Sequence, residues 1–321
     1  MKLGRNEKNL VYRNNGGGSS MQNWWSLKLR EVKANKHSYI LLAPYMVLFA
    51  VFTILPVIIS IVLSFTYFNM LEFPKFIGWQ NYTRLFLEDD VFLIAVKNTI
   101  LFAVITGPIS YIACFVFAWI INELSPKVRA VMTLVFYAPS ISGNVFFIWL
   151  MIFSGDRYGI ANGLLLKLGF ILEPLQWLKT EAYIMPIIIL VQLWLSLGTG
   201  FLAFIAGLQT VDSTLYEAGA VDGIKNRWQE LWYITLPSMR PQLMFGAVIQ
   251  LTTAFAVADV SIALAGFPSV NYAAETIVTH LIDFGTTRFE MGYASAIATV
   301  LFMIMVGSNL IVQKLLRKVG E

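Results

Sequence analysis

Long blocks without any Lys, Arg, Asp or Glu alternate along this chain with shorter polar segments. Six blocks stand out, and only the fifth of them contains a charge, the single acid Asp259: 38–71, 99–122, 131–153, 182–211, 241–274 and 291–313. A bilayer core about 30 Å thick needs roughly 20 apolar residues as a helix. Because backbone groups in lipid must be bonded within the helix itself, each block predicts a membrane span. We therefore predict an all-α, polytopic membrane protein with six transmembrane helices.

The distribution of basic residues predicts how the spans are oriented. The chain has 23 Lys and Arg against 19 Asp and Glu, a formal net charge of +4. Sixteen of the basic residues fall in the two termini and in segments 123–130 and 212–240, which six spans place on one side, and seven fall on the other. The positive-inside rule then puts both termini in the cytoplasm of a multi-pass cell-membrane protein. The excess of basic residues is explained by the orientation of the spans in the membrane, so no nucleic-acid partner is needed to account for it.

Composition predicts three regions in the 321-residue chain. Residues 1–37 form a basic cytoplasmic tail with a Gly/Ser run at 16–20, and Trp24 and Trp25 are placed to contact membrane lipid ahead of the first span. The tail lacks the short apolar core of a removable signal peptide. Residues 38–318 form the six-helix domain, and 208–240 is its cytoplasmic loop.

Several classes of function are excluded by residue content. With 57% hydrophobic and 13% charged residues the chain is not an ordinary soluble domain. The single cysteine and two histidines leave no material for a usual zinc site, so no metal is expected. No Gly-x-x-x-x-Gly-Lys phosphate loop, His-Glu-x-x-His or Gly-x-Ser-x-Gly occurs. We expect no catalytic residues and no ATP cofactor bound in this chain.

The linkers on the outer side are long, over 72–98, 154–181 and 267–290. They carry most of the external acids, which we expect to be solvated charges. Segments 91–97 and 277–284 have helical periodicity, which predicts short helices that lie on the membrane surface or cover a cavity.

The most specific local pattern is in the cytoplasmic linker between spans four and five. Thr214 and Glu217 have the spacing of a capping box, which predicts a helix that begins there. The helix should continue to Asp222 and end at Gly223, which can adopt the left-handed conformation without a Cβ clash. Residues 225–237 predict a second helix along the membrane face, turned into span five by Pro237.

Asp259 is the other residue that the pattern singles out. An ionised side chain near the middle of a membrane costs about 2.5–3.5 kcal/mol on insertion scales, so exposure to lipid is disfavoured. Two interpretations stay open: Asp259 faces a transport pathway, or it forms a hydrogen bond between helices. Gln192 and Gln250 are weaker candidates for a pathway.

The cytoplasmic loop contains Glu217-Ala218-Gly219, Gly223 and Ile234-Thr235-Leu236-Pro237, and Asp222 lies within the same segment. Through these residues the loop resembles that of permease subunits of bacterial ATP-binding-cassette (ABC) importers of the carbohydrate type. Three departures are visible: Gly219 replaces an alanine, Val211 replaces a common proline, and ten residues rather than nine separate Gly223 from Ile234.

The resemblance implies a type I importer permease that moves a mono- or oligosaccharide. Its partners would be a second permease, two cytoplasmic ATPase subunits that bind ATP and magnesium, and an external solute-binding protein. The loop would dock in an ATPase cleft through Glu217, and an aspartate often occupies the position of Asp259 in the family. The alternative function is a self-contained secondary transporter or channel, although no internal repeat is evident.

Overall fold

The computed structural model describes residues 35–143 and 145–317, and it divides into two units, 1–59 and 60–321. The predicted tail therefore lies outside the described residues up to position 34. Apart from one two-stranded hairpin, β1 (Thr66–Tyr67) with β2 (Lys75–Phe76), the described elements are helices. This agrees with the all-α prediction.

The first span is one apolar helix over Lys36–Leu63. It consists of α2 (Lys36–Phe49), a π turn (Ala50–Ile54) and α3 (Leu55–Leu63). The prediction that it continues to residue 71 is wrong. Asn81 explains the end of the helix, because its amide nitrogen donates to the carbonyl oxygens of Ser64 and Thr66 at 2.8 and 2.9 Å and holds that stretch for pairing with β2.

The second span begins earlier than the charge pattern indicates. Helix α4 (Gln80–Leu87) precedes it, and α5 then runs for 33 residues from Asp90 to Asn122. The helical structure predicted for 91–97 is confirmed, but these residues form the first turns of α5 instead of a short helix of their own. Asp89 sets this start: its carboxylate accepts a hydrogen bond from the backbone N–H of Phe92 at 2.9 Å and so caps the helix.

The third span is sharply bent. Helices α6 (Pro126–Ile141) and α7 (Phe146–Ile152) meet at 83°. By length and composition the described residues contain five helices able to cross a membrane, or six if this bent pair counts as one span. The six predicted blocks thus each correspond to a helix or a bent pair.

Spans four and five each contain a short break. Span four is α9 (Glu181–Leu195) followed by α10 (Thr199–Gln209), and span five is α14 (Arg240–Phe255) followed by α15 (Asp259–Ala265). Span six is α17 (Met291–Arg317), which is continuous. Asp259 is therefore the first residue of a new helix, whereas the sequence placed it inside an unbroken span.

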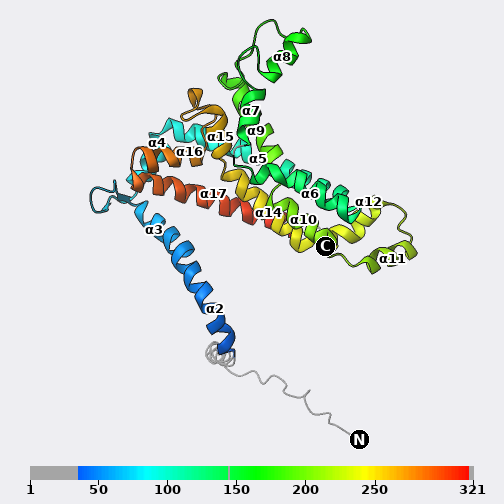
Figure 1. The fold of residues 1–321 in the computed structure, drawn as a ribbon. Helices are drawn as coiled ribbons and strands as arrows, with labels where there is room; N and C mark the ends of the chain where they lie inside the picture. The colour runs from blue at the N-terminus through cyan, green and yellow to red at the C-terminus, as the bar shows by residue number, and fades with distance from the viewer. Residues whose placement is uncertain (1–34, 144, 318–321) are drawn as a thin grey trace. The chain divides into compact units, whose positions relative to one another are not determined.

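The linker helices lie at the two ends of the 60–321 bundle (Figure 1). One end has α11 (Ser213–Val221), α12 (Arg227–Glu230), a π turn (Leu231–Thr235) and α13 (Leu236–Ser238). The other has α4, a 3-10 turn (Val270–Tyr272), α16 (Ile277–Ile282) and a π turn (Asp283–Thr287). Helix α8 (Ile160–Lys167) belongs to the outer linker 154–181, and α16 confirms the helix predicted over 277–284.

Three apolar clusters hold this bundle together. One packs α5 against α14, α16 and α17, with Phe92, Ile277 and Ile297 fully buried. A second packs α9 against α15, and a third packs the far end of α5 against α10 through Phe201 and Phe204. Helix α5 contributes to all three clusters, so it connects the two ends of the molecule.

Candidate functional site

Helix α11 of the cytoplasmic loop begins two residues earlier than the sequence indicates. Its N-cap is Asp212, whose carboxylate accepts a hydrogen bond from the backbone N–H of Thr214 at 2.9 Å. This bond also holds the pKa of Asp212 below its usual range. The predicted Thr214–Glu217 capping box is wrong, because an aspartate two residues upstream reaches the same free donors first. The Glu217 side chain is left without a capping role.

The end of α11 confirms the prediction for Gly223. Its φ is +96°, in the left-handed region. The N–H of Ile224 donates to the carbonyl oxygen of Gly219 at 2.9 Å, and the N–H of Gly223 donates to that of Ala220 at 3.3 Å. This pair of bonds is a Schellman motif, which satisfies the last carbonyl groups of the helix. Residues 213–221 therefore form a short helix that is capped at both ends.

Helix α11 rests on the following π turn. A Cβ atom on Gly219 would lie 2.7 Å from the terminal carbon of Ile234 and 3.0 Å from that of Ile224, so these side chains fill the space that the usual alanine would occupy. The Tyr216 hydroxyl lies 2.9 Å from that of Thr235 in a second contact. Gly219 and Ile234 are buried, which makes them the inner support of α11.

The other predicted coupling residues face outward. Glu217, Ala218, Asp222, Gly223 and Pro237 are exposed, and Leu236 is half-buried. Among the described residues, none forms an ion pair with Glu217 or Asp222. The exposed face of α11 is thus free to contact another protein.

The extra residue after Gly223 falls in a segment that contains a π turn. The Asn226 carboxamide caps α12 by accepting from the N–H of Gln229 at 2.9 Å, and Leu231–Thr235 then follows i to i+5 bonding. A π turn holds one more residue than an α turn. It therefore offers room for the tenth residue while Ile234 keeps its place under Gly219.

Arg227, which sequence reasoning missed, connects this loop to α5. Its guanidinium forms ion pairs with Glu123, at the end of α5, at 2.8 Å and with Glu230 at 2.7 Å. The indole rings of Trp119 and Trp228 pack beside these pairs with centroids 5.2 Å apart. The loop is thus bound to α5 by side chains as well as to α14 by the chain itself.

A cavity of about 460 Å³ lies where the third and fifth spans are broken. Residues 139–143, 145 and 146 of the third span and 256–260 of the fifth line it, together with Gln192 of α9. The Asp259 side chain is exposed in this cavity, and no described residue forms a hydrogen bond or ion pair with its carboxylate. This geometry favours the pathway interpretation over the interhelical hydrogen bond.

A smaller cavity of about 230 Å³ shares Ser140, Gln192 and Thr253 with the first and adds Tyr137. Apolar side chains form much of the wall of the two cavities, and the polar side chains among them carry hydroxyl or amide groups, with Asp259 as the one charged side chain among those that line them. Such a wall supplies hydrogen-bonding groups without a strong electrostatic field. The pair of cavities can therefore hold a polar, uncharged solute.

Gln250 lines the smaller cavity, and it also holds helices together. It is only 4% exposed, and its amide nitrogen donates to the Ser196 carbonyl oxygen at 3.1 Å and to Cys114 Sγ at 3.0 Å. These bonds connect α14 with α5 and the end of α9. Its nitrogen is therefore occupied in packing, whereas Gln192 has no such bond among the described residues.

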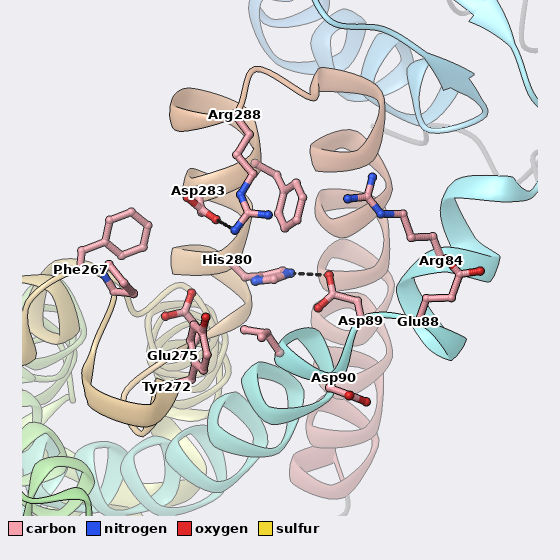
Figure 2. Close-up of a pocket in the computed structure, with 13 residues that line it drawn as sticks. Arg84, Glu88, Asp89, Asp90, Phe267, Tyr272, Glu275, His280, Asp283 and Arg288 are labelled. Carbon is pink, nitrogen blue, oxygen red and sulfur yellow. Dashed lines mark hydrogen bonds and ion pairs between the residues drawn. The ribbon is translucent and has the colours of Figure 1, made fainter.

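A third cavity, of about 470 Å³, lies at the opposite end from α11 and is lined by residues of two of the three outer linkers, 72–98 and 267–290 (Figure 2). Asp89 accepts from the Tyr293 hydroxyl at 2.7 Å and lies 2.9 Å from His280 Nε2. Burial raises the pKa of Asp89, but the bonds from His280, Tyr293 and the Phe92 N–H outweigh burial and lower that pKa to about 2.

The expectation that the external acids are solvated is therefore wrong for part of this group. Asp89 is bonded inside the cavity wall, Asp283 pairs with Arg288 at 2.7 Å, and Glu290 pairs with Arg84. Glu275 is 4% exposed. An acid directly before an apolar helical run is an N-cap signal that could have identified Asp89. The Arg84–Glu290 pair has no such local signal, because it joins residues 206 positions apart.

Comparison with known proteins gives consistent matches. Residues 124–320 match the family described as "Binding-protein-dependent transport system inner membrane component". The chain is 31% identical over 279 residues to the probable ABC transporter permease protein YesP of Bacillus subtilis (strain 168), covering 85% of this chain and 88% of the relative. It is 30% identical to the arabinooligosaccharides transport system permease protein AraP of the same organism, covering 86% and 87%.

The fold is also that of a solved transporter. A chain of the bacterial alginate ABC transporter, in complex with an alginate pentasaccharide-bound periplasmic protein, matches with a TM-score of 0.73 at 23% identity, covering 91% of this chain and 98% of that chain. The bent and broken spans described above are thus part of an architecture that matches a known importer.

Proposed function

This chain belongs to the binding-protein-dependent transport system inner membrane component family, whose members are multi-pass permease subunits without catalytic activity of their own, and on that premise we propose that it translocates a carbohydrate. The solute would be a mono- or oligosaccharide delivered by an external solute-binding protein. The earlier alternative, a self-contained secondary transporter or channel, loses its support with family membership.

The proposal assigns the work of transport to several subunits. Two cytoplasmic ATPase subunits would bind ATP and magnesium, and a second, related permease would complete the pathway. The observation that carries this division is α11: it is capped at both ends, seated on Ile234 and exposed along the face with Glu217, Ala218 and Asp222. A rigid, separately capped helix can transmit a push without unravelling.

The carbohydrate assignment is supported by the wall of the two central cavities. Ser140, Gln192 and Thr253 offer hydrogen-bonding groups, Tyr137 offers an aromatic face, and Asp259 offers acceptor oxygens. These are the groups that recognise sugar hydroxyls and the apolar face of a sugar ring. The name of the relative AraP, which refers to arabinooligosaccharides, supports the same class of solute.

A charge reversal at Glu217 tests the coupling role. In vesicles with the complete transporter, Glu217→Lys should abolish ATP-driven uptake while the permease still reaches the membrane, because the exposed carboxylate would no longer pair with a basic residue of the ATPase. Glu173→Lys, an exposed acid on the predicted outer side, serves as the matched control and should leave uptake unchanged. Uptake retained by Glu217→Lys, with the ATPase still bound, would contradict the coupling role.

A further inference from the structure

The charged side chains around the outer cavity fall into two groups. The first group is paired: His280 with Asp89, Arg288 with Asp283, and Arg84 with Glu290. Both arginines also lie 4.2 Å from an aromatic ring centre, Arg84 over Tyr293 and Arg288 over Phe284. The basic groups of the cavity are thus already neutralised and held in place.

The second group consists of three acids, Glu88, Asp90 and Glu275, which line the same cavity. None of them forms an ion pair with a described residue. Once the pairs of the first group are set aside, these carboxylates leave the cavity with excess negative charge. A positively charged group would therefore be attracted to it.

Glu275 makes this more than a surface cluster of acids. Glu275 is only 4% exposed. Figure 2 shows it on the cavity wall beside Tyr272, on the same side as His280 and Asp283. Burial raises the pKa of Glu275. The nearby Thr279 hydroxyl donates its proton to the Thr276 carbonyl oxygen at 2.9 Å. A buried carboxylate therefore faces the cavity without a cation.

The neighbours of Glu275 select an organic cation over a metal ion. Phe267, Pro268 and Tyr272 line the cavity beside it. No group of three metal-ligating side chains within reach of one ion occurs among the described residues. Carboxylate together with an aromatic surface is the environment that a lysine ammonium or an arginine guanidinium prefers. The cavity volume of about 470 Å³ leaves room for such a side chain to enter.

We propose that this outer cavity is a docking socket that receives a lysine or arginine side chain of the solute-binding protein, with Glu275 as its anchor. The inference rests on the proposed function, since it needs an external partner. The cavity lies at the end of the bundle opposite α11, on the predicted outer side, where a binding protein must approach. Desolvation of the entering cation is offset by the carboxylate that already faces the cavity.

The test measures docking of the purified solute-binding protein on the complete transporter in lipid nanodiscs. Its Kd is determined at 50 and 300 mM KCl for wild type, Glu275→Gln and Glu72→Gln. Glu72 is the matched control, because it is an exposed external acid already paired with Lys75. We expect Glu275→Gln to weaken low-salt binding about tenfold or more and to reduce the salt dependence, because an ion pair is lost. Glu72→Gln should bind as wild type.

Each outcome decides one proposal. Wild-type affinity of Glu275→Gln for the solute-binding protein would overturn the socket. The socket would also be overturned if Glu275→Gln separated the two permeases while the solute-binding protein still docked with wild-type affinity. If Glu275→Gln does not assemble, the double variant Glu88→Gln/Asp90→Asn, at exposed positions of the same cavity, takes its place. It should weaken low-salt binding at least twofold, and unchanged binding would equally overturn the socket. Failure of wild type to bind any solute-binding protein would instead refute the proposed function.

Discussion

The Arg227 bridge gives a prediction about how motion leaves the cytoplasmic loop. Arg227 pairs with Glu123 at 2.8 Å and with Glu230 at 2.7 Å, and its side chain is 62% exposed. Exposed ion pairs contribute about 0.2–1 kcal/mol each, and the pair with Glu123 is the one that joins the loop to α5, so it stabilises this contact by about 1 kcal/mol at most. This is little for the stability of a whole membrane protein, but it is enough to shift a two-state contact up to about fivefold.

The perturbation is a charge swap. Arg227→Glu places three acids together, and Glu123→Arg places two cations together, so each single variant should release α5 from the loop. The double variant restores an opposite-charge pair between the same two elements. In proteoliposomes, solute imported per ATP hydrolysed should fall severalfold in each single variant and should recover to within about twofold of wild type in the double variant.

The matched control is a swap of Glu72 and Lys75, an exposed external pair within one linker. It should leave the import ratio unchanged. Two results would refute the reasoning: single variants with the wild-type ratio of import to hydrolysis, or a double variant whose loss is the sum of the two single losses. Either would mean that Arg227 does not transmit motion to α5.

Three further predictions follow from the geometry. Asp259→Asn should change the rate or the range of solutes imported without lowering the amount of protein, because its carboxylate faces the central cavity; if lower abundance in membranes were its sole effect, the residue would serve packing instead. Gly223→Ala should lower the free energy of unfolding by about 1–2 kcal/mol, because its φ is +96°, and should also lower uptake. Gly169→Ala, with the same penalty at a φ of +72° in the outer loop, should lower stability alone. Equal uptake by the two variants would argue against a rigid α11. Because the pKa of Asp89 is lowered, its ionised carboxylate contributes at most about 2 kcal/mol to stability after allowance for solvent, and this contribution is present above pH 4 and lost as the pH falls toward 2. Asp89→Asn should therefore flatten the dependence of the thermal stability of the purified complex on pH over that range. An unchanged dependence on pH would contradict the bond to His280.

The sequence predicts the spans well because charge is excluded from lipid wherever the chain crosses it. It also predicts α11 and the role of Gly223, since both depend on residues close in sequence. The exact helix start depends on a competition between two caps, Asp212 and Thr214, which local pattern alone does not decide.

The helix breaks have no comparable signal in the sequence. The residues from Ala256 to Ala258 are apolar and helix-compatible, and the chain leaves the helix there before α15 begins. Likewise, the sequence does not show that Gln250, which lines the smaller cavity, also bonds through its amide to Cys114 and Ser196. Such pairings bring together distant parts of the chain, and the hydropathy of single blocks does not contain them.

The most direct test of the whole account is solute uptake by proteoliposomes that contain both permeases, with and without the ATPase subunits, supplied with ATP and the loaded solute-binding protein. The account predicts concentrative uptake in the complete complex and none when the ATPases are left out or when Glu217 is replaced by lysine. Uptake by the permeases alone, at the rate of the complete complex, would contradict it.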